Sequence, residues 1–134
     1  MPTTLEHPLS LWPSSALMAF VQRQVFRDTP NAGMERRTEP RLVLGMPVIV
    51  HGVDERISPI GEPQAMVIRD FSRTGTGLIH ELPFEHPRLV MRLSYPEEGT
   101  LLAAEVRWSK PLGPFYQLGC EIVAKLKSFP AFEV

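Results

Sequence analysis

The sequence predicts an all-β domain, a barrel or a sandwich of about six short strands, preceded by a single helix. Two observations lead to this fold class. Apolar residues alternate with polar ones in six runs after residue 41, which is the period of half-buried strands. The 14 prolines are spread along the 134 residues, which disfavours a helical bundle and favours short elements joined by turns.

The N-terminal helix is expected from Pro13 to Arg27. Apolar residues share one side of a helical wheel there, and Ser14 or Ser15 is suited to the N-cap. This apolar face could pack on the domain, contact a second copy or a protein partner, or lie on a membrane surface. Its residues are Leu17, Met18, Phe20, Val21 and Val25.

A polar linker, "DTPNAG" followed by "MERRTEPR", separates the helix from the strands. The turn-rich separators "YPEEGT" and "KPLGPF" predict antiparallel hairpins between consecutive strands. In the tail, Phe129 and Phe132 are expected to cover a barrel end, and a short helix could form. The strand positions are Leu42, Leu44, Met46, Val48 and Val50; Met66 and Ile68; Leu78 and Ile79; Leu89, Met91 and Leu93; Leu102, Ala104, Val106 and Trp108; Tyr116, Leu118, Cys120 and Ile122.

The composition is that of an ordinary globular domain. Apolar residues make up 43% and charged residues 22%, and the net charge of -1 gives no overall attraction to nucleic acid or anionic membrane. The N-terminus lacks a signal pattern, and its apolar stretch "ALMAF" is far shorter than the roughly 20 residues of a membrane span. Cys120 is expected to be a buried strand thiol. We therefore expect a reduced, cytoplasmic protein.

The octet "DFSRTGTG", Asp70 to Gly77, closes the second expected strand and carries polar groups suited to a ligand. Asp70 could accept hydrogen bonds from N1 and N2 of guanine, and Ser72 could bond a phosphate. Gly75 and Gly77 would let backbone amides approach a ligand closely. The alternative is a plain hairpin turn in which Asp70 and Ser72 cap their own backbone.

Arginines precede the first strand in "RRTEPR". Arg36, Arg37 and Arg41 lie on a segment whose proline disfavours helix, so we expect an extended cationic arm. The planar guanidinium binds phosphate oxygens or the guanine edge bidentately and stacks on a base. The alternative is a solvated linker whose charges pair with Glu35 and Glu39.

Together the two segments match a family pattern. "RTEPR" (Arg37 to Arg41) and "DFSRTG" (Asp70 to Gly75) fit RxxxR and (D/N)xSxxG, in the order and about the separation found in PilZ domains. The chain from Glu35 to Val123 therefore resembles a PilZ domain, a bacterial receptor module for the second messenger cyclic di-GMP. "LGCEIV" is similar to the final barrel strand of that family. The resemblance implies a six-stranded antiparallel barrel.

The resemblance also implies roles for the motif residues. Arg37 and Arg41 would clasp guanine and phosphate groups, and Asp70, Ser72 and Gly75 would form the opposing surface on the barrel. A basic residue at the position of Arg36 tends in this family to accompany an intercalated ligand dimer, so we expect two ligands per domain. A solvated Arg36 is the alternative.

Other residues near the motifs are ranked lower. Alternation on the fifth strand points Trp108 inward, where it would cap the barrel core, with a base-stacking platform at the rim as the alternative. Arg73 and Arg107 could add positive potential near the ligand, although surface arginines usually do no more. Arg69 is expected on the opposite face of its strand from Asp70 and is left out of the site.

The expected layout is an N-terminal extension (1–33), a barrel domain (34–125) with a ligand-clasping arm (34–41), and a tail (126–134). Without ligand the arm should be disordered, because its like charges repel. Binding would fold it over the nucleotide and reorient the helix. A chain this short should signal through an unidentified protein effector, and the helix could also mediate homo-oligomers.

The alternative functions are weaker. A PilZ-like adaptor with little or no nucleotide affinity is the main one, and RNA binding is disfavoured by the charge and the few exposed aromatic residues. The histidines His7, His51, His80 and His86 show no metal-ligand spacing, and His80 beside Glu81 is interpreted as a surface pair. We expect no enzyme activity, no metal and no cofactor.

Overall fold

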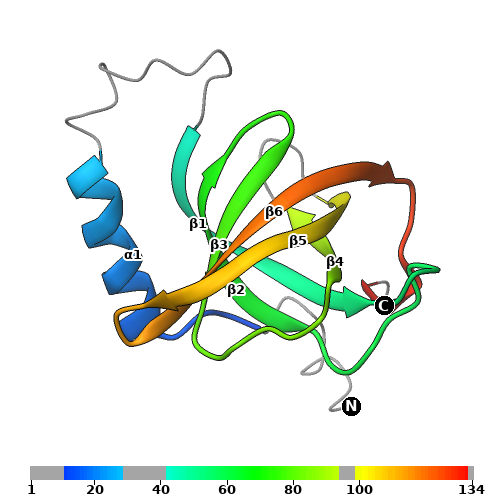
Figure 1. Ribbon diagram of the computed structural model, residues 1–134, viewed down its shortest axis with the longest axis horizontal. Coiled ribbons are helices and arrows are strands. Elements are labelled where there is room, and N and C mark those ends of the chain that lie inside the picture. Colours follow the sequence, from blue (N-terminus) through cyan, green and yellow to red (C-terminus); the bar gives the residue numbers. More distant parts are fainter. Residues whose placement is uncertain (1–10, 29–41, 94–98, 133–134) are drawn as a thin grey trace, which may run out of the picture.

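The computed structural model describes residues 11–28, 42–93 and 99–132, and Figure 1 shows a barrel of strands with one helix along its side. The helix and the six strands were expected from the sequence. Their bounds are α1 (Ser15–Asp28), β1 (Leu42–Val53), β2 (Gln64–Phe71), β3 (Gly75–His80), β4 (Arg88–Leu93), β5 (Thr100–Leu112) and β6 (Phe115–Leu126), followed by a short 3-10 turn (Pro130–Phe132).

The strands close into a barrel in the order β1-β2-β3-β6-β5-β4, and every neighbouring pair is antiparallel. This confirms the all-β fold and selects the barrel over the sandwich. The expectation that all consecutive strands form hairpins is wrong for β3 and β4. The chain crosses from β3 to β4 through residues 81–87, because β6 occupies the free edge of β3 and β4 closes the barrel against β1.

The barrel interior holds the main core. Val48 and Val50 of β1 lie inside with Met66 and Ile68 of β2, as their alternation predicts. The core continues through residues of the other strands, namely Leu78, Leu89, Met91, Leu93, Ala104, Leu118 and Cys120, with Phe84 from the crossover.

A second apolar cluster lies outside the barrel wall. Ile49 of β1 and Val90 of β4 alternate with interior residues and so face outward. Phe129 and Phe132 pack on them, and the two rings make an edge-to-face contact with centroids 5.1 Å apart. The expectation that these rings cover a barrel end is therefore wrong. The tail covers the outer wall of β1, β4 and β5.

Helix α1 covers another part of the outer wall. Leu17 and Val21 are fully buried against Val67 of β2 and Ile79 of β3. The Ser14 side chain caps the helix, since its hydroxyl accepts the N–H of Leu17 at 3.1 Å. Of the three surfaces considered for the apolar face, the domain itself receives it. No helix among the described residues has both the length and the apolar character needed to span a bilayer.

Candidate functional site

The turn between β2 and β3 is the local frame of the octet. The N–H of Ser72 donates to the carbonyl of Gly75 at 2.8 Å, and the N–H of Gly75 donates to the Ser72 hydroxyl at 3.2 Å. A Cβ on Gly75 would lie 3.1 Å from the carbonyl oxygen of Cys120, which is tighter than ordinary contact. Ser72 and Gly75 therefore build a tight turn packed against β6, as the structural alternative for this segment anticipated.

The carboxylate of Asp70 lies over the backbone of β3. It is buried, and its Oδ1 accepts the N–H of Gly77 at 3.0 Å. A Cβ on Gly77 would come within 3.0 Å of that same oxygen. Thr76, the neighbour of Gly77 on β3, also holds Asp70, because its hydroxyl donates to the backbone carbonyl of Asp70 at 2.9 Å. Gly77 thus leaves the space that the Asp70 carboxylate fills.

Four residues from four neighbouring strands form one row on the outer face of the barrel. Asp70 pairs with Gly77, Gly77 pairs with Gly119 of β6, and Gly119 pairs with Trp108 of β5. A Cβ on Gly119 would overlap Cε2, Nε1 and Cζ2 of the Trp108 indole. The indole therefore lies directly over Gly119.

We call Asp70, Gly77, Gly119 and Trp108 the glycine row. A hollow of about 120 Å³ opens on it, with Asp70 and Trp108 among its walls. Because the two glycines lack side chains, the Asp70 carboxylate packs over Gly77 and the indole packs over Gly119. A ligand in the hollow would therefore meet a carboxylate and an aromatic ring.

The inward orientation expected for Trp108 is wrong, since 44% of the residue is exposed. The register explains the error. Val106 pairs with Cys120 and Trp108 pairs with the adjacent Gly119, so Arg107 is the extra residue of a β-bulge. A bulge reverses the alternation and turns the next side chain to the other face. Trp108 stands at the rim, beside the hollow.

A second bulge corrects the placement of Arg69. Ile68 pairs with Leu78 and Asp70 pairs with the adjacent Gly77, so Arg69 is the extra residue on β2. Its guanidinium therefore reaches the same side as Asp70, and Nη1 donates to Oδ2 of that carboxylate at 3.2 Å. Simple alternation placed Arg69 on the opposite face, and this was wrong.

Arg107 lines the hollow next to Trp108 and is held by two carboxylates. Its Nε donates to Oε1 of Glu121 at 2.8 Å, Nη2 contacts the same oxygen, and Nη2 also lies 3.3 Å from Oε1 of Glu105. The hydrogen bond to Glu121 and its charge raise the pKa of Arg107 above its ordinary value. Arg73 is exposed in the turn and does not line the hollow.

Cys120 also lines the hollow, on β6 next to Gly119. The thiol is buried as the sequence predicted, and burial raises its pKa to about 12. A thiol with that pKa is almost entirely protonated at neutral pH, so it contributes packing and no nucleophile.

The arginines Arg36, Arg37 and Arg41 lie outside the described residues, but the strand that follows them is placed. Leu42 pairs with Phe71 and Val43 pairs with Asp70, so β1 starts beside the octet. The chain segment that carries RxxxR therefore leads directly into the strand next to Asp70.

The interpretation of His80 as a surface pair is wrong. His80 ends β3, is buried, and its Nδ1 lies 2.8 Å from the carbonyl oxygen of Leu82. Burial lowers its pKa, against the opposing effects of this hydrogen bond and of Glu81. Within the described part of the chain, no group of three His, Cys, Asp or Glu side chains is placed to hold a metal ion.

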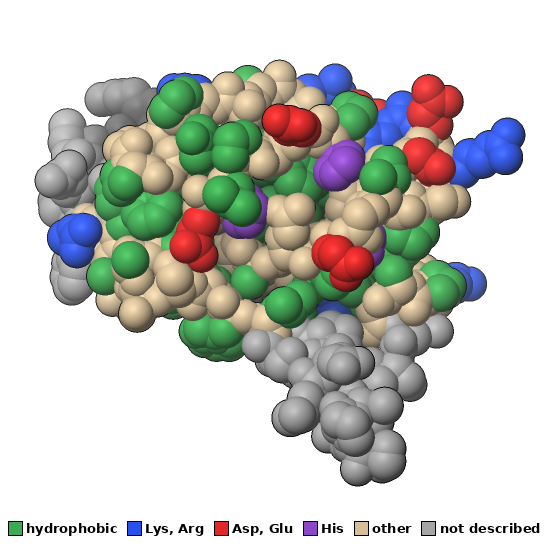
Figure 2. Space-filling view, turned by 90° about the horizontal axis from the view of Figure 1, so that it is seen from below, with side chains coloured by type: hydrophobic (Ala, Val, Ile, Leu, Met, Phe, Trp, Pro, Cys, Tyr) green, Lys and Arg blue, Asp and Glu red, His purple; other side chains and the backbone are tan. Residues whose placement is uncertain are grey.

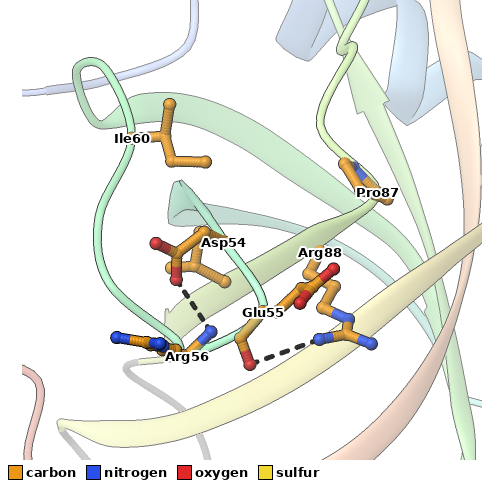
Figure 3. Close-up of a pocket in the computed structure, with 7 residues that line it drawn as sticks. Asp54, Glu55, Arg56, Ile60, Pro87 and Arg88 are labelled. Atoms are coloured by element: carbon orange, nitrogen blue, oxygen red, sulfur yellow. Dashed lines mark hydrogen bonds between the residues drawn. The ribbon is translucent and has the colours of Figure 1, made fainter.

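A larger cavity, about 550 Å³, opens at the other end of β1 (Figure 3). The loop from Asp54 to Ile60 lines it together with Pro87 and Arg88. Its polar groups stabilise the loop itself, since Asp54 accepts the N–H of Arg56 at 2.8 Å and Arg88 donates to the Glu55 carbonyl at 3.3 Å. It contains no octet residue and is not the candidate site.

On the face shown in Figure 2, hydrophobic and acidic side chains occupy the middle, and the Lys and Arg side chains lie at the margins. A polyanion such as nucleic acid finds no basic patch on that face.

Sequence reasoning missed Gly119 and Arg69 as site residues. A signal for Gly119 was present, because a glycine inside a strand often marks a close approach of another group. Nothing in a single sequence showed the bulge that turns Arg69 toward Asp70.

A search of curated proteins gave no match. Among solved structures, the Bacillus subtilis inhibitor of motility (MotI/DgrA) is 19% identical over 69% of this chain and 45% of that chain, with a TM-score of 0.49. MrkH, a c-di-GMP dependence transcription regulatory factor, is 20% identical over 66% and 43%, with a TM-score of 0.46.

The complex of K. pneumonia MrkH with c-di-GMP is 21% identical over 67% of this chain and 45% of that chain, with a TM-score of 0.43. The chain thus spans less than half the length of these three proteins. The family model of the PilZ domain matches residues 35–128, well over half of the 134 residues, with both motifs and all six strands inside the match. The chain belongs to the PilZ domain family.

Proposed function

We propose that this protein is a cyclic di-GMP receptor. The proposal rests on the pairing of two strands, because the strand that directly follows one motif pairs with the strand in which the other begins. Asp70, Ser72 and Gly75 of the (D/N)xSxxG pattern lie on the β2–β3 hairpin, and the RxxxR pattern ends one residue before Leu42, which pairs with Phe71. Consecutive Cα atoms are about 3.8 Å apart, so the arginine arm starts within reach of the hairpin.

The ligand would contact complementary groups at this place. The Asp70 carboxylate suits the N1 and N2 donors of guanine, and the Trp108 indole over Gly119 offers an aromatic face for stacking. Arg37 and Arg41 would clasp guanine and phosphate, with Ser72 and the amides of Gly75 and Gly77 opposite. With Arg36 as a further cation, we propose that two intercalated nucleotides bind.

The proposed mechanism is an ordering of the arm, residues 34–41, over the nucleotide. The arm connects to the segment after α1, so its closure would pull on a helix packed through Leu17 and Val21. The signal would then pass to a protein partner through an altered surface, in the bacterial cytoplasm where this second messenger acts.

Hydrogen exchange tests the helix part of this mechanism. The amides of α1 are expected to exchange at a different rate in the presence of cyclic di-GMP. Exchange that stays the same while the nucleotide is bound would contradict a role for the helix.

Calorimetric titration of cyclic di-GMP tests the receptor itself. Micromolar or tighter binding is expected for the wild type, with a stoichiometry near two. Arg37→Ala and Asp70→Ala should abolish it, because each removes a charged partner of the ligand. Arg23→Ala is the matched control, since Arg23 is an exposed arginine on α1, and its affinity should equal that of the wild type.

One observation favours the adaptor as the second candidate. Ser72 and Asp70 already have partners within the hairpin, so their presence is explained without a ligand. Absence of binding by calorimetry and by a second method would overturn the receptor and leave a PilZ-like protein-interaction adaptor.

A further inference from the structure

We propose that Arg107, which neither motif includes, is an additional phosphate-binding residue and that Glu121 positions it. This inference rests on the proposed function and deepens it, because it assigns a phosphate contact of this chain's own at the β5 end of the glycine row. The other phosphate contacts proposed above come from the arm and from the hairpin.

The first support is the place of Arg107 in the fold. It is the extra residue of the β5 bulge, so its side chain lies on the same face as Trp108 and lines the same hollow. Among the described residues, Asp70 and Arg107 are the ionisable groups that line the hollow besides the protonated Cys120. A base that bonds the Asp70 carboxylate and stacks on the indole would leave its phosphate near Arg107, on the cationic side of the hollow.

The second support is the way the guanidinium is held. Oε1 of Glu121 on β6 accepts hydrogen bonds from Nε and Nη2 of Arg107. Oε1 of Glu105 lies 3.3 Å from the same Nη2. These contacts use one edge of the guanidinium, and within the described residues Nη1 makes no hydrogen bond or ion pair. The two N–H groups of Nη1 are thus available to a phosphate oxygen.

The third support is that the ion pair with Glu121 lowers the entropy that the Arg107 side chain loses when a ligand binds. An arginine loses rotamer freedom when it binds, and the Arg107 side chain is 55% exposed. Glu121 restricts that freedom before any ligand arrives, which is preorganisation. Glu121 is therefore a positioning residue, whereas Arg107 is the residue that would touch the ligand.

Titration of cyclic di-GMP into Arg107→Ala at several salt concentrations tests this contact. The affinity should fall about fivefold to tenfold, the range for an exposed charge-assisted hydrogen bond. The slope of affinity against salt should also decrease, because one phosphate contact is lost. A change in fold alone would not reduce the slope. Arg107→Lys, which keeps the charge without the fork, should give an intermediate affinity.

Arg88→Ala is the matched control. Arg88 also pairs with Glu105, with Nε 3.5 Å from Oε2, but it lines other cavities. Its affinity and salt slope should equal those of the wild type. Glu121→Ala should weaken binding severalfold. Glu121→Gln keeps an acceptor oxygen without the charge, so it should recover part of the affinity that Glu121→Ala loses.

The outcomes separate the two proposals. If the wild type binds and Arg107→Ala binds equally well with the same salt slope, the role of Arg107 is wrong and the receptor stands. If Arg107→Lys equals the wild type, the directed contact is wrong, and tighter binding by Glu121→Ala would overturn the positioning role. Absence of binding by the wild type would overturn the receptor and this inference together.

Discussion

Gly119 shapes the candidate site because it has no side chain. The indole of Trp108 fills the space in which a β-carbon at residue 119 would lie. The side chain and the glycine belong to different strands, so neither position alone explains the arrangement. A glycine in the middle of a strand weakens the strand, and here the indole that covers it restores contact with the sheet.

Gly119→Ala should therefore expel the indole. A Cβ there would overlap the ring, so Trp108 must leave the sheet, and we expect weaker cyclic di-GMP binding with a loss of about 1–3 kcal/mol of stability. In a Trp12→Phe background the remaining tryptophan emission should shift to longer wavelength. The same emission in Gly119→Ala and in its parent would show that the indole does not lie on Gly119.

His80 makes stability depend on pH. Burial is the main cause of its lowered pKa, so the folded state favours the neutral ring. Between the folded-state pKa and the ordinary value of 6.5, the unfolded chain binds more protons, and the free energy of unfolding falls as pH decreases through this window. Urea unfolding at pH 7.5 and at pH 5.5 measures this fall in the free energy of unfolding.

His80→Gln is the control for this prediction, because glutamine can still donate to the Leu82 carbonyl but does not titrate. The difference in stability between the two pH values should be smaller in the variant. An equal difference in both proteins would exclude His80 as the source.

At the scale of elements, periodicity predicted the helix and the strands and failed at their irregularities. Leu17 and Val21, and the alternating Val48 and Val50, lie where their periods indicate. Both errors within the site arose at bulges, because one extra residue reverses alternation and a single sequence does not mark it. The bulge residues, Arg69 and Arg107, each sit beside a residue of the glycine row.

The prediction of the strand order from sequence failed in a similar way, at the connection from β3 to β4. The β3–β4 connection resembles other turn-rich separators in sequence, yet it crosses between strands that do not pair. Pairing of β3 with β6 is a long-range contact, which local turn chemistry does not encode. The octet residues were found from sequence because their motif is local, whereas Gly119 lies more than 40 residues after Gly77 and joins it only through this pairing.

Helix α1 should unfold together with the barrel. Leu17 is fully buried against the outer wall, so Leu17→Ala should reduce the free energy of unfolding by about 2–4 kcal/mol in urea. Gln22→Ala, at an exposed position of the same helix, is the control and should change it by less than about 0.5 kcal/mol. A small effect of Leu17→Ala would mean that the helix is only loosely attached.

The whole molecule is a barrel whose wall carries apolar clusters on both its inner and its outer face. One core fills the interior, while α1 and the C-terminal tail cover separate parts of the outside. The glycine row remains on the outer wall at the end of the barrel where β1 begins, and the 550 Å³ cavity lies where β1 ends. The residues whose NMR signals change on ligand addition therefore show at which end of the barrel a ligand binds.

Amide NMR spectra during titration with cyclic di-GMP make that assignment directly. We predict saturable shifts for the amides of Gly75, Gly77 and Gly119 and for the indole N–H of Trp108, with little change from Asp54 to Ile60. Shifts confined to the Asp54–Ile60 loop, or none at all at saturating nucleotide, would contradict a nucleotide site on the glycine row.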